Sequence, residues 1–275
     1  MCQISTFNME LFWYIIILLI FGIIVGAIGT MAGIGAGVII VSILTLFFLI
    51  PINEAIDTST LIILIASGAG FVTYLKQGRT DLKLSITLAG FTILGSLICT
   101  IIFLIIKIDN TALRLIFATV MVVTGANMIF KAIQTHKRLK NQTDNEELQD
   151  FSLKDFDYKA NLKKSIPLFM LAGFLANLIG IGGGVVMVPT LNIVLGYPIH
   201  NSTAISTSVI FFTAIFNTIV KVIIGKIQYL IGIVIGIGAV LGSIIGAKIS
   251  NKMPKVTLQC FVAIVLISLG ILMYF

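Results

Sequence analysis

Long apolar runs separated by short polar turns dominate this sequence. Many of these runs are close to or longer than the roughly 17–25 residues that an α-helix needs to cross a bilayer. Examples are Leu11–Ile28, Leu84–Ile106, Leu115–Phe130 and Val256–Phe275. The pattern predicts an all-α, multi-pass protein of the cell membrane.

The composition favours lipid as the surrounding medium. Of the 275 residues, 58% are hydrophobic and only 11% are charged, which is too little charge to cover a water-exposed surface. The formal net charge is +7, but the basic residues lie in short loops between apolar segments, as is typical of membrane proteins. We therefore expect the lipid bilayer as a partner and no nucleic acid.

The two halves of the chain are similar to each other. When the sequence is shifted by 147 positions, glycine, proline, serine and threonine residues coincide in constant register. Such matches are hard to obtain by chance and indicate a duplicated unit. The matched pairs include Gly26 with Gly173, Gly33 with Gly180, Gly35 with Gly182, Gly37 with Gly184, Pro51 with Pro198, Ser59-Thr60 with Ser206-Thr207, and Gly95-Ser96 with Gly242-Ser243.

The duplication predicts three parts of the chain. Residues 11–131 form a first transmembrane repeat, 132–164 a polar cytoplasmic linker, and 165–275 a second transmembrane repeat. Each repeat has four to five apolar segments, and the second segment is short. Val38–Ile50, for example, would give about 20 Å of helix, whereas a hydrocarbon core is about 30 Å thick. We therefore expect short or broken helices at this place in each repeat.

The charge of the loops leaves two arrangements open. If each repeat crosses the membrane five times, the repeats are inverted and fourteen of the eighteen Lys and Arg residues lie inside. If one short segment is re-entrant, the repeats run parallel and thirteen lie inside. Positive residues prefer the inside, so we predict inverted repeats, with parallel repeats as the alternative.

Two glycine-rich turns, Gly33–Gly37 and Gly180–Gly184, interrupt apolar stretches at corresponding places. A broken helix presents backbone N–H groups and a positive dipole end inside lipid, so an anion can be bound there without a buried Lys or Arg. Close packing of helices through small residues is the alternative explanation. Serine and threonine hydroxyls and one amide nearby could assist as neutral donors. The predicted substrate-binding residues are Gly33, Gly35, Gly37, Ser59, Thr60, Asn177, Gly180, Gly182, Gly183, Gly184, Ser206 and Thr207.

Other chemistry has few candidate residues in this sequence. There is no Gly-Lys-Ser/Thr phosphate-binding motif, and the two histidines, His136 and His200, belong to the linker and a loop. No Ser/His/Asp or Cys/His set falls at membrane depth. We therefore expect no catalytic residue, no metal site and no cofactor, and we do not expect an enzyme.

The second repeat carries a specific pattern of residues. It contains Gly180-Ile-Gly-Gly-Gly184, Pro189, Pro198 and Ala204-Ile-Ser-Thr-Ser208. In this pattern and its duplication, the chain resembles the TauE/SafE sulfite exporter family. The first repeat departs from the pattern, because Ala36 replaces the middle glycine and Ser42 stands opposite Pro189. The resemblance implies a plasma-membrane permease for sulfite, organosulfonates or other small sulfur-containing or carboxylate anions.

The sequence thus predicts a secondary transporter of a small anion, such as sulfite or an organosulfonate, that works by alternating access. Its coupling ion is expected to be H⁺ or Na⁺, because no ATP-binding motif is present. Alternatives are a non-transporting membrane scaffold or assembly factor, or a transporter of a carboxylate or a metal cation. A homo-oligomer is also compatible with the sequence.

Overall fold

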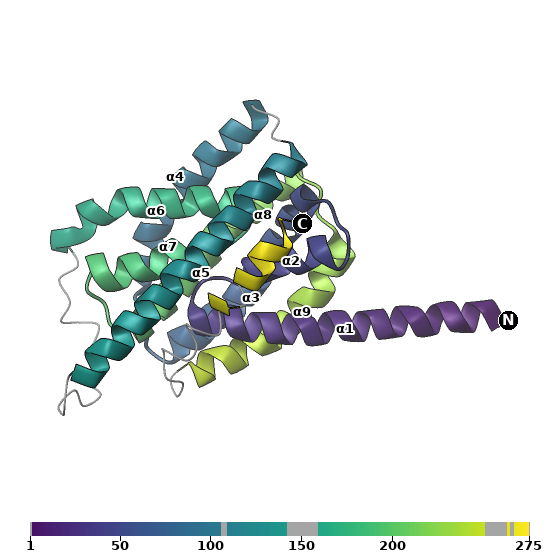
Figure 1. The fold of residues 1–275 in the computed structure, drawn as a ribbon, viewed down its shortest axis with the longest axis horizontal. Coiled ribbons are helices and arrows are strands. Elements are labelled where there is room, and N and C mark those ends of the chain that lie inside the picture. The colour runs from purple at the N-terminus through teal and green to yellow at the C-terminus, as the bar shows by residue number, and fades with distance from the viewer. Residues whose placement is uncertain (1, 106–108, 142–158, 251–262, 265–266, 275) are drawn as a thin grey trace.

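A computed structural model of the chain describes residues 2–105, 109–141, 159–250, 263–264 and 267–274. Their regular secondary structure is helical, as predicted. The helices are α1 (Cys2–Ala32), α2 (Gly37–Leu46), α3 (Ile52–Lys76), α4 (Leu82–Ile105), α5 (Asn110–Asn141), α6 (Lys159–Ile179), α7 (Gly184–Pro189), the π-helix η2 (Thr190–Val194), α8 (Ile199–Ile224) and α9 (Tyr229–Ile249). Figure 1 shows how they are arranged.

Five helices of the described part are long and apolar enough to cross a membrane. These stretches are Trp13–Ala32, Ile52–Lys76, Leu82–Ile105, His200–Ile224 and Tyr229–Ile249. Shorter apolar helices cover Gly37–Leu46, Asn110–Val123 and Gly184–Val194. The predicted all-helical, multi-pass architecture is confirmed at this level.

The central helix of the arrangement is α3. Of its apolar stretch 61% is buried, against 33 to 50% in the other four long helices. It packs against α8 and α9 along much of its length, and α8 in turn packs against α4. Leucine and isoleucine side chains exposed on α4 and α9, such as Leu104 and Ile237, are suited to lipid contact. The most buried helix therefore lies where a polar site can be kept away from lipid.

Glycines allow α4 and α6 to cross at very short range. A Cβ atom on Gly95 of α4 would fall on the carbonyl oxygen of Met170, and one on Gly173 of α6 would fall on the carbonyl oxygen of Thr92. The Ser96 hydroxyl donates a hydrogen bond to the Gly173 carbonyl oxygen at 2.9 Å. Small residues thus bring the two backbones together, as is common in membrane proteins.

The contact between α1 and α9, which lie side by side in Figure 1, has the same construction. A Cβ on Gly242 would fall on the Ile23 carbonyl oxygen, and one on Gly26 would fall on that of Ala239. The Ser243 hydroxyl donates to the Gly26 carbonyl oxygen at 3.4 Å. The glycines and the serine of this contact stand 147 positions from their counterparts in the crossing of α4 and α6.

The predicted linker, residues 132–164, is only partly described. α5 continues through its first part to Asn141, and α6 begins at Lys159. Residues 142–158 lie outside the described residues. The last predicted segment, 256–275, is described at 263–264 and 267–274. Here a Cβ on Gly270 would lie 3.1 Å from the Met121 side chain of α5.

Two glycines of α4 allow a matched test of the crossing with α6. We expect Gly95→Ala to destabilise the protein by about 1–3 kcal/mol, because the new methyl group overlaps backbone of α6. A Cβ on Gly90 has nothing within 4 Å, so Gly90→Ala should leave stability unchanged or raise it by up to about 1 kcal/mol through helix propensity. Thermal unfolding of the detergent-solubilised variants measures both effects. Equal melting temperatures for the two variants would contradict the crossing.

Candidate functional site

Two loops break the helical path in the protein interior. The first glycine loop, Gly33–Gly37, separates α1 from α2, and the second glycine loop, Gly180–Gly184, separates α6 from α7. Gly35 has φ +78° and Gly182 has φ +81°. Residues other than glycine rarely adopt this left-handed conformation. These two positions require glycine for the chain to turn.

The two glycine loops lie in direct contact. A Cβ on Gly37 would fall on the carbonyl oxygen of Gly180, and a Cβ on Gly184 would fall on that of Gly33. A Cβ on Gly35 would lie 3.5 Å from the Cα of Gly182. No side chain fits between these backbones, so the four helix ends converge at one place.

Each glycine loop is held by a serine from the long helix of the other half. Ser206 of α8 donates to the Gly33 carbonyl oxygen at 2.8 Å. Ser59 of α3 donates to the Gly180 carbonyl oxygen at 3.3 Å and to that of Ile56 at 2.7 Å. Both serines are fully buried. Because the hydroxyl protons are used in this way, these serines position the loops in this conformation.

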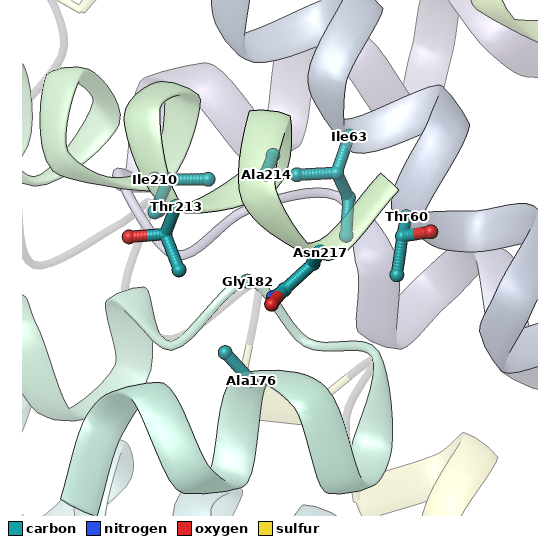
Figure 2. Close-up of a pocket in the computed structure, with 8 residues that line it drawn as sticks. All are labelled: Thr60, Ile63, Ala176, Gly182, Ile210, Thr213, Ala214 and Asn217. Carbon is teal, nitrogen blue, oxygen red and sulfur yellow. The ribbon is translucent and has the colours of Figure 1, made fainter. Parts of the chain in front are cut away.

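A small cavity lies beside the second glycine loop, and we call it the Asn217 cavity (Figure 2). Its volume of about 10 Å³ is roughly what one water molecule needs. Asn217 is 4% exposed, and its Oδ1 has no hydrogen-bond partner. Figure 2 shows its amide end directed toward Gly182. The lining residues are Thr60, Ile63, Ala176, Gly182, Ile210, Thr213, Ala214 and Asn217.

A second cavity of about 10 Å³ lies beside the first glycine loop, and we call it the Ser67 cavity. Its lining residues are Gly29, Thr30, Gly35, Ala36, Ile63, Ala66, Ser67, Thr207 and Ile210. Gly29, Gly35, Ser67 and Thr207 each stand 147 positions from a residue of the Asn217 cavity. Ile63 and Ile210 line both cavities. They therefore lie between them.

The polar groups that line the two cavities are neutral. The described residues of both linings contribute hydroxyl, amide and backbone groups, and none is Asp, Glu, Lys, Arg, His or Cys. Thr60 donates to the carbonyl oxygen of Asp57, and Thr207 donates to that of Thr203. Hydroxyl groups bonded to their own helix in this way keep an oxygen lone pair free, and the proton can rotate to another acceptor.

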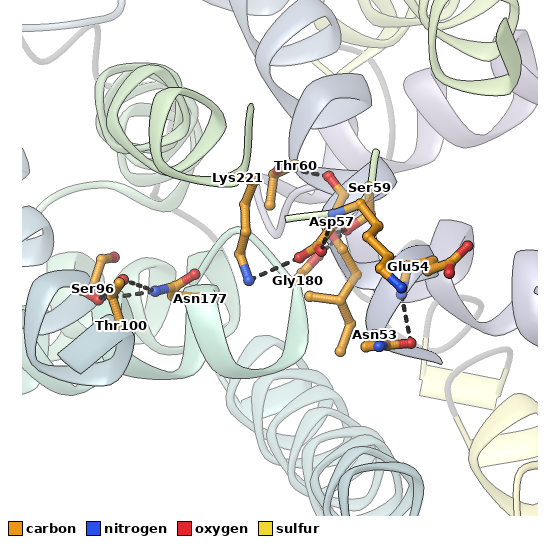
Figure 3. Close-up of polar contacts among 12 residues, drawn as sticks. Asn53, Glu54, Asp57, Ser59, Thr60, Ser96, Thr100, Asn177, Gly180 and Lys221 are labelled. Atoms are coloured by element: carbon orange, nitrogen blue, oxygen red, sulfur yellow. Dashed lines mark hydrogen bonds and ion pairs between the residues drawn. The ribbon is translucent and has the colours of Figure 1, made fainter. Parts of the chain in front are cut away.

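The structure gathers most of the predicted site residues. The seven glycines form the two loops, Ser59 and Ser206 bind those loops, and Thr60 and Thr207 line the cavities. Asn177 is elsewhere: its Nδ2 donates to the Ser96 carbonyl oxygen at 2.9 Å and to Thr100 Oγ1 at 2.7 Å (Figure 3). It therefore joins α6 to α4 and is outside both linings. A substrate role for any of the twelve residues stays a prediction.

The structure adds residues that were not among the predicted site residues. Asn217, Thr213, Thr30 and Ser67 line the cavities. Asn217 follows Ser206 by eleven positions, which is about three helical turns and the same helix face. As a single polar residue within an apolar helix, Asn217 has either a packing or a pathway role by sequence alone, and its position on the helix face of Ser206 is the signal that favours the pathway.

An ion pair joins α3 to α8 next to the Asn217 cavity. Lys221 Nζ lies 2.8 Å from Asp57 Oδ1 (Figure 3). The other carboxylate oxygen, Oδ2, accepts a hydrogen bond from the backbone N–H of Lys226 at 2.9 Å. Both oxygens of the carboxylate therefore have partners.

The opposite end of α3 has a different cation. The guanidinium of Arg79, in the loop before α4, lies 5.1 Å from the centre of the Tyr74 ring and donates to the His200 carbonyl oxygen at 2.9 Å. Burial lowers the pKa of Arg79 below its usual value, and the neighbouring Tyr74 hydroxyl acts in the opposite direction. This cation is held by an aromatic ring and a backbone carbonyl.

Comparison with known proteins gives consistent results. A family model described as "Sulfite exporter TauE/SafE" matches residues 18–273. A "Probable membrane transporter protein" of Methanocaldococcus jannaschii is 31% identical over 205 residues, which cover 72% of this chain and 69% of that protein. The "Probable membrane transporter protein YunE" of Bacillus subtilis is 26% identical over 209 residues, which cover 73% and 75%. No solved structure gives a significant match.

The serine contacts make a testable contribution to stability. We expect Ser59→Ala and Ser206→Ala each to lower the free energy of unfolding by about 1–3 kcal/mol, because each removes a buried donor to a loop carbonyl. Ser268, which is exposed and bonds to the Ile264 carbonyl of its own segment, provides the control Ser268→Ala. Thermal unfolding in detergent is the measurement. A loss for Ser268→Ala as large as for the buried serines would refute the assignment.

Proposed function

Since the chain belongs to the TauE/SafE sulfite exporter family, we propose that it is a secondary transporter of a small anion, such as sulfite or an organosulfonate, that moves by alternating access. The prediction of this family is confirmed. The prediction that the protein is a membrane transporter and not an enzyme is confirmed as well. The anion, its site and the mechanism are the proposed part.

The observation that carries the proposal is the buried amide of Asn217 beside the second glycine loop. A buried polar atom without a partner is uncommon, and it points to a water molecule or a ligand. Asn217 Oδ1 has no protein partner, and the cavity that it lines also contains Gly182 and Thr60. In this orientation Oδ1 is an acceptor and suits a water molecule. Rotation of the amide by about 180° would turn its NH₂ group toward an anionic oxygen, and threonine hydroxyl groups can rotate to do the same.

Neutral donors favour an anion over a metal cation. Sites for divalent cations in proteins usually include at least one carboxylate, imidazole or thiolate group, and the described linings of both cavities contain none of these. Helix α2 begins at Gly37 and helix α7 begins at Gly184. The first N–H groups of each helix have no acceptor within that helix. These N–H groups add partial positive charge beside the cavities.

The paired cavities support the prediction of two repeats that work in opposition. Each cavity combines a loop glycine of one half, Gly182 or Gly35, with a threonine from the long helix of the other half, Thr60 or Thr207. Contacts of this crossed kind are expected when two inverted repeats face each other. In this conformation each cavity has room for about one water, so an anion requires the loops and long helices to move apart. H⁺ or Na⁺ is the proposed coupling ion.

A flux measurement tests the substrate class. Protein reconstituted in proteoliposomes should move at least one of sulfite, sulfoacetate, taurine, sulfate or a small carboxylate down its gradient, and liposomes without protein serve as the control. A bound anion should also raise the melting temperature, because a ligand of the native state stabilises it. If none of these solutes is transported and none shifts the melting temperature, the anion proposal is wrong.

A substitution at Asn217 tests the site itself. We expect Asn217→Ala to raise the KM for the transported anion about tenfold, since a hydrogen bond to a charged group contributes about 1.5–3 kcal/mol. Asn53, which is exposed and bonds to the backbone N–H of Glu54, gives the control Asn53→Ala, with an expected KM equal to that of the parent. An unchanged KM in Asn217→Ala would remove this residue from the site.

A further inference from the structure

The Asp57–Lys221 ion pair lies directly beyond one end of the Asn217 cavity. On α3, Thr60 follows Asp57 by three positions, and on α8, Lys221 follows Asn217 by four. Residues three or four positions apart share a helix face. The ion pair is therefore one helical turn from the pair of polar residues that line the cavity, toward the N-terminal end of α3.

Exposure decreases from the ion pair toward the cavity. The Lys221 side chain is 19% exposed, and as whole residues Asp57 is 8% exposed, Asn217 4% and Thr60 3%. Between them, the Thr218 hydroxyl donates to the Thr60 carbonyl oxygen at 3.2 Å and binds α8 to α3. The ion pair thus lies closer to the surface than the polar residues of the cavity.

Lys221 has one anionic partner among the residues that the structure describes. Its Nζ pairs with Asp57 and lies 5.9 Å from the centre of the Phe103 ring of α4. Asp57, in contrast, is also fixed by the backbone N–H of Lys226. If the pair separates, the carboxylate keeps a donor and the ammonium needs a new acceptor.

The corresponding place in the other half carries no ion pair. A shift of 147 positions places Tyr74 opposite Lys221 and Ala204 opposite Asp57. Tyr74 and Ala204 are fully buried and pack together with Ala247. The Tyr74 hydroxyl donates to the carbonyl oxygen of Thr30, which lines the Ser67 cavity. This end is therefore closed by a buried aromatic ring that has the Arg79 guanidinium 5.1 Å from its centre, and not by an ion pair between the two long helices.

We propose that Asp57 and Lys221 form a one-sided gate over the Asn217 cavity, and that Lys221 leaves Asp57 to bind the oxygens of the entering anion. This assignment rests on the proposed transport of an anion and identifies the cation that the anion would meet at the end of the Asn217 cavity. Sulfite-like and sulfonate-like oxygens are suitable acceptors, because each can replace a carboxylate oxygen at an ammonium group.

The exchange avoids a large cost of separating buried charges. A buried ion pair that loses one partner leaves an uncompensated charge, which is strongly unfavourable. An arriving anion provides that compensation for Lys221, and the Lys226 N–H remains for Asp57. Without an anion the gate stays closed, and a neutral solute offers Lys221 no equivalent partner.

Thiol labelling tests the gate without any assumption about the substrate. In a background with Cys2→Ser, Cys99→Ala and Cys260→Ser, Ala214→Cys introduces a reporter in the cavity lining. A membrane-impermeant maleimide is added to right-side-out and inside-out vesicles. We expect Asp57→Asn with Lys221→Met to increase the labelling rate from one face about tenfold. The amide introduced by Asp57→Asn retains an acceptor for the Lys226 N–H, so both neutral side chains suit the folded state.

The neighbouring lysine provides the matched control. Lys226 is exposed, and its backbone N–H is the group that contacts Asp57, so Lys226→Gln removes a positive charge nearby while the ion pair stays intact. Its labelling rate should equal that of the parent. If the Asp57→Asn/Lys221→Met protein is labelled no faster than the parent from either face, the gate is refuted.

Flux measurements test the role of Lys221 as an anion ligand. We expect Lys221→Met, alone or with Asp57→Asn, to raise the KM of the transported anion about tenfold, whereas Asp57→Asn alone should not raise it. Folded protein is verified by its melting temperature, and the double variant covers the case in which Lys221→Met alone does not fold. A parental KM in both lysine variants refutes the ligand role. Absence of anion flux in the parent refutes the proposed function, while the labelling result still decides the gate.

Discussion

The close contact between the two glycine loops is the constraint on which the rest of this structure depends. The backbones of Gly33–Gly37 and Gly180–Gly184 approach so closely that a Cβ on Gly37 would overlap the carbonyl oxygen of Gly180. Any larger residue there would separate the short helices α2 and α7 and the ends of α1 and α6. The loop-binding serines and both cavities are arranged around this contact. The glycines therefore allow the backbones to pack closely and also interrupt the helices. Close packing and helix interruption are thus compatible explanations for the glycines in these loops.

A consequence of this construction is that the described residues lining the two cavities are neutral, and that the Asp57–Lys221 ion pair lies one helical turn away from them. Hydroxyl, amide and backbone groups can be buried at modest cost when they are hydrogen-bonded, whereas an isolated buried charge is far more costly. The structure follows this order: Ser59 and Ser206 are uncharged and fully buried, while the Asp57–Lys221 pair is partly exposed. Negative charge delivered to the interior by a solute is then not opposed by a resident carboxylate in the described linings.

Residues whose identity reflects a steric requirement were predictable from the sequence. Glycine in register across the two halves indicated helix breaks, and both breaks occur at those glycines. Side-chain direction was less predictable: Asn177 stands one turn before a break, yet its amide faces α4 because of how α6 is rotated. Comparison between the halves also passed over the Asp57–Lys221 pair, since its counterparts are Ala204 and Tyr74. The departure at Ala36 has a local reason, because its φ of −69° suits alanine, whereas its counterpart Gly183 has φ +78°.

The two cavities are built alike but closed differently, and this difference bears on how the two halves could contribute unequally to the proposed transport. If the halves exchange conformations during transport, the rearrangement of the backbone is equivalent on both sides, because the loop and helix contacts recur at the same spacing. The side chains that must move are not equivalent. Opening past Tyr74 removes a buried ring from its packing, breaks a hydrogen bond to Thr30 and disturbs the contact of the ring with the Arg79 guanidinium. Opening past Lys221 separates an ion pair, at a cost that an anion can offset. In the proposed mechanism, an ion pair that an anion can exchange therefore lies at one end only, and this asymmetry arises from the few positions at which the two halves differ.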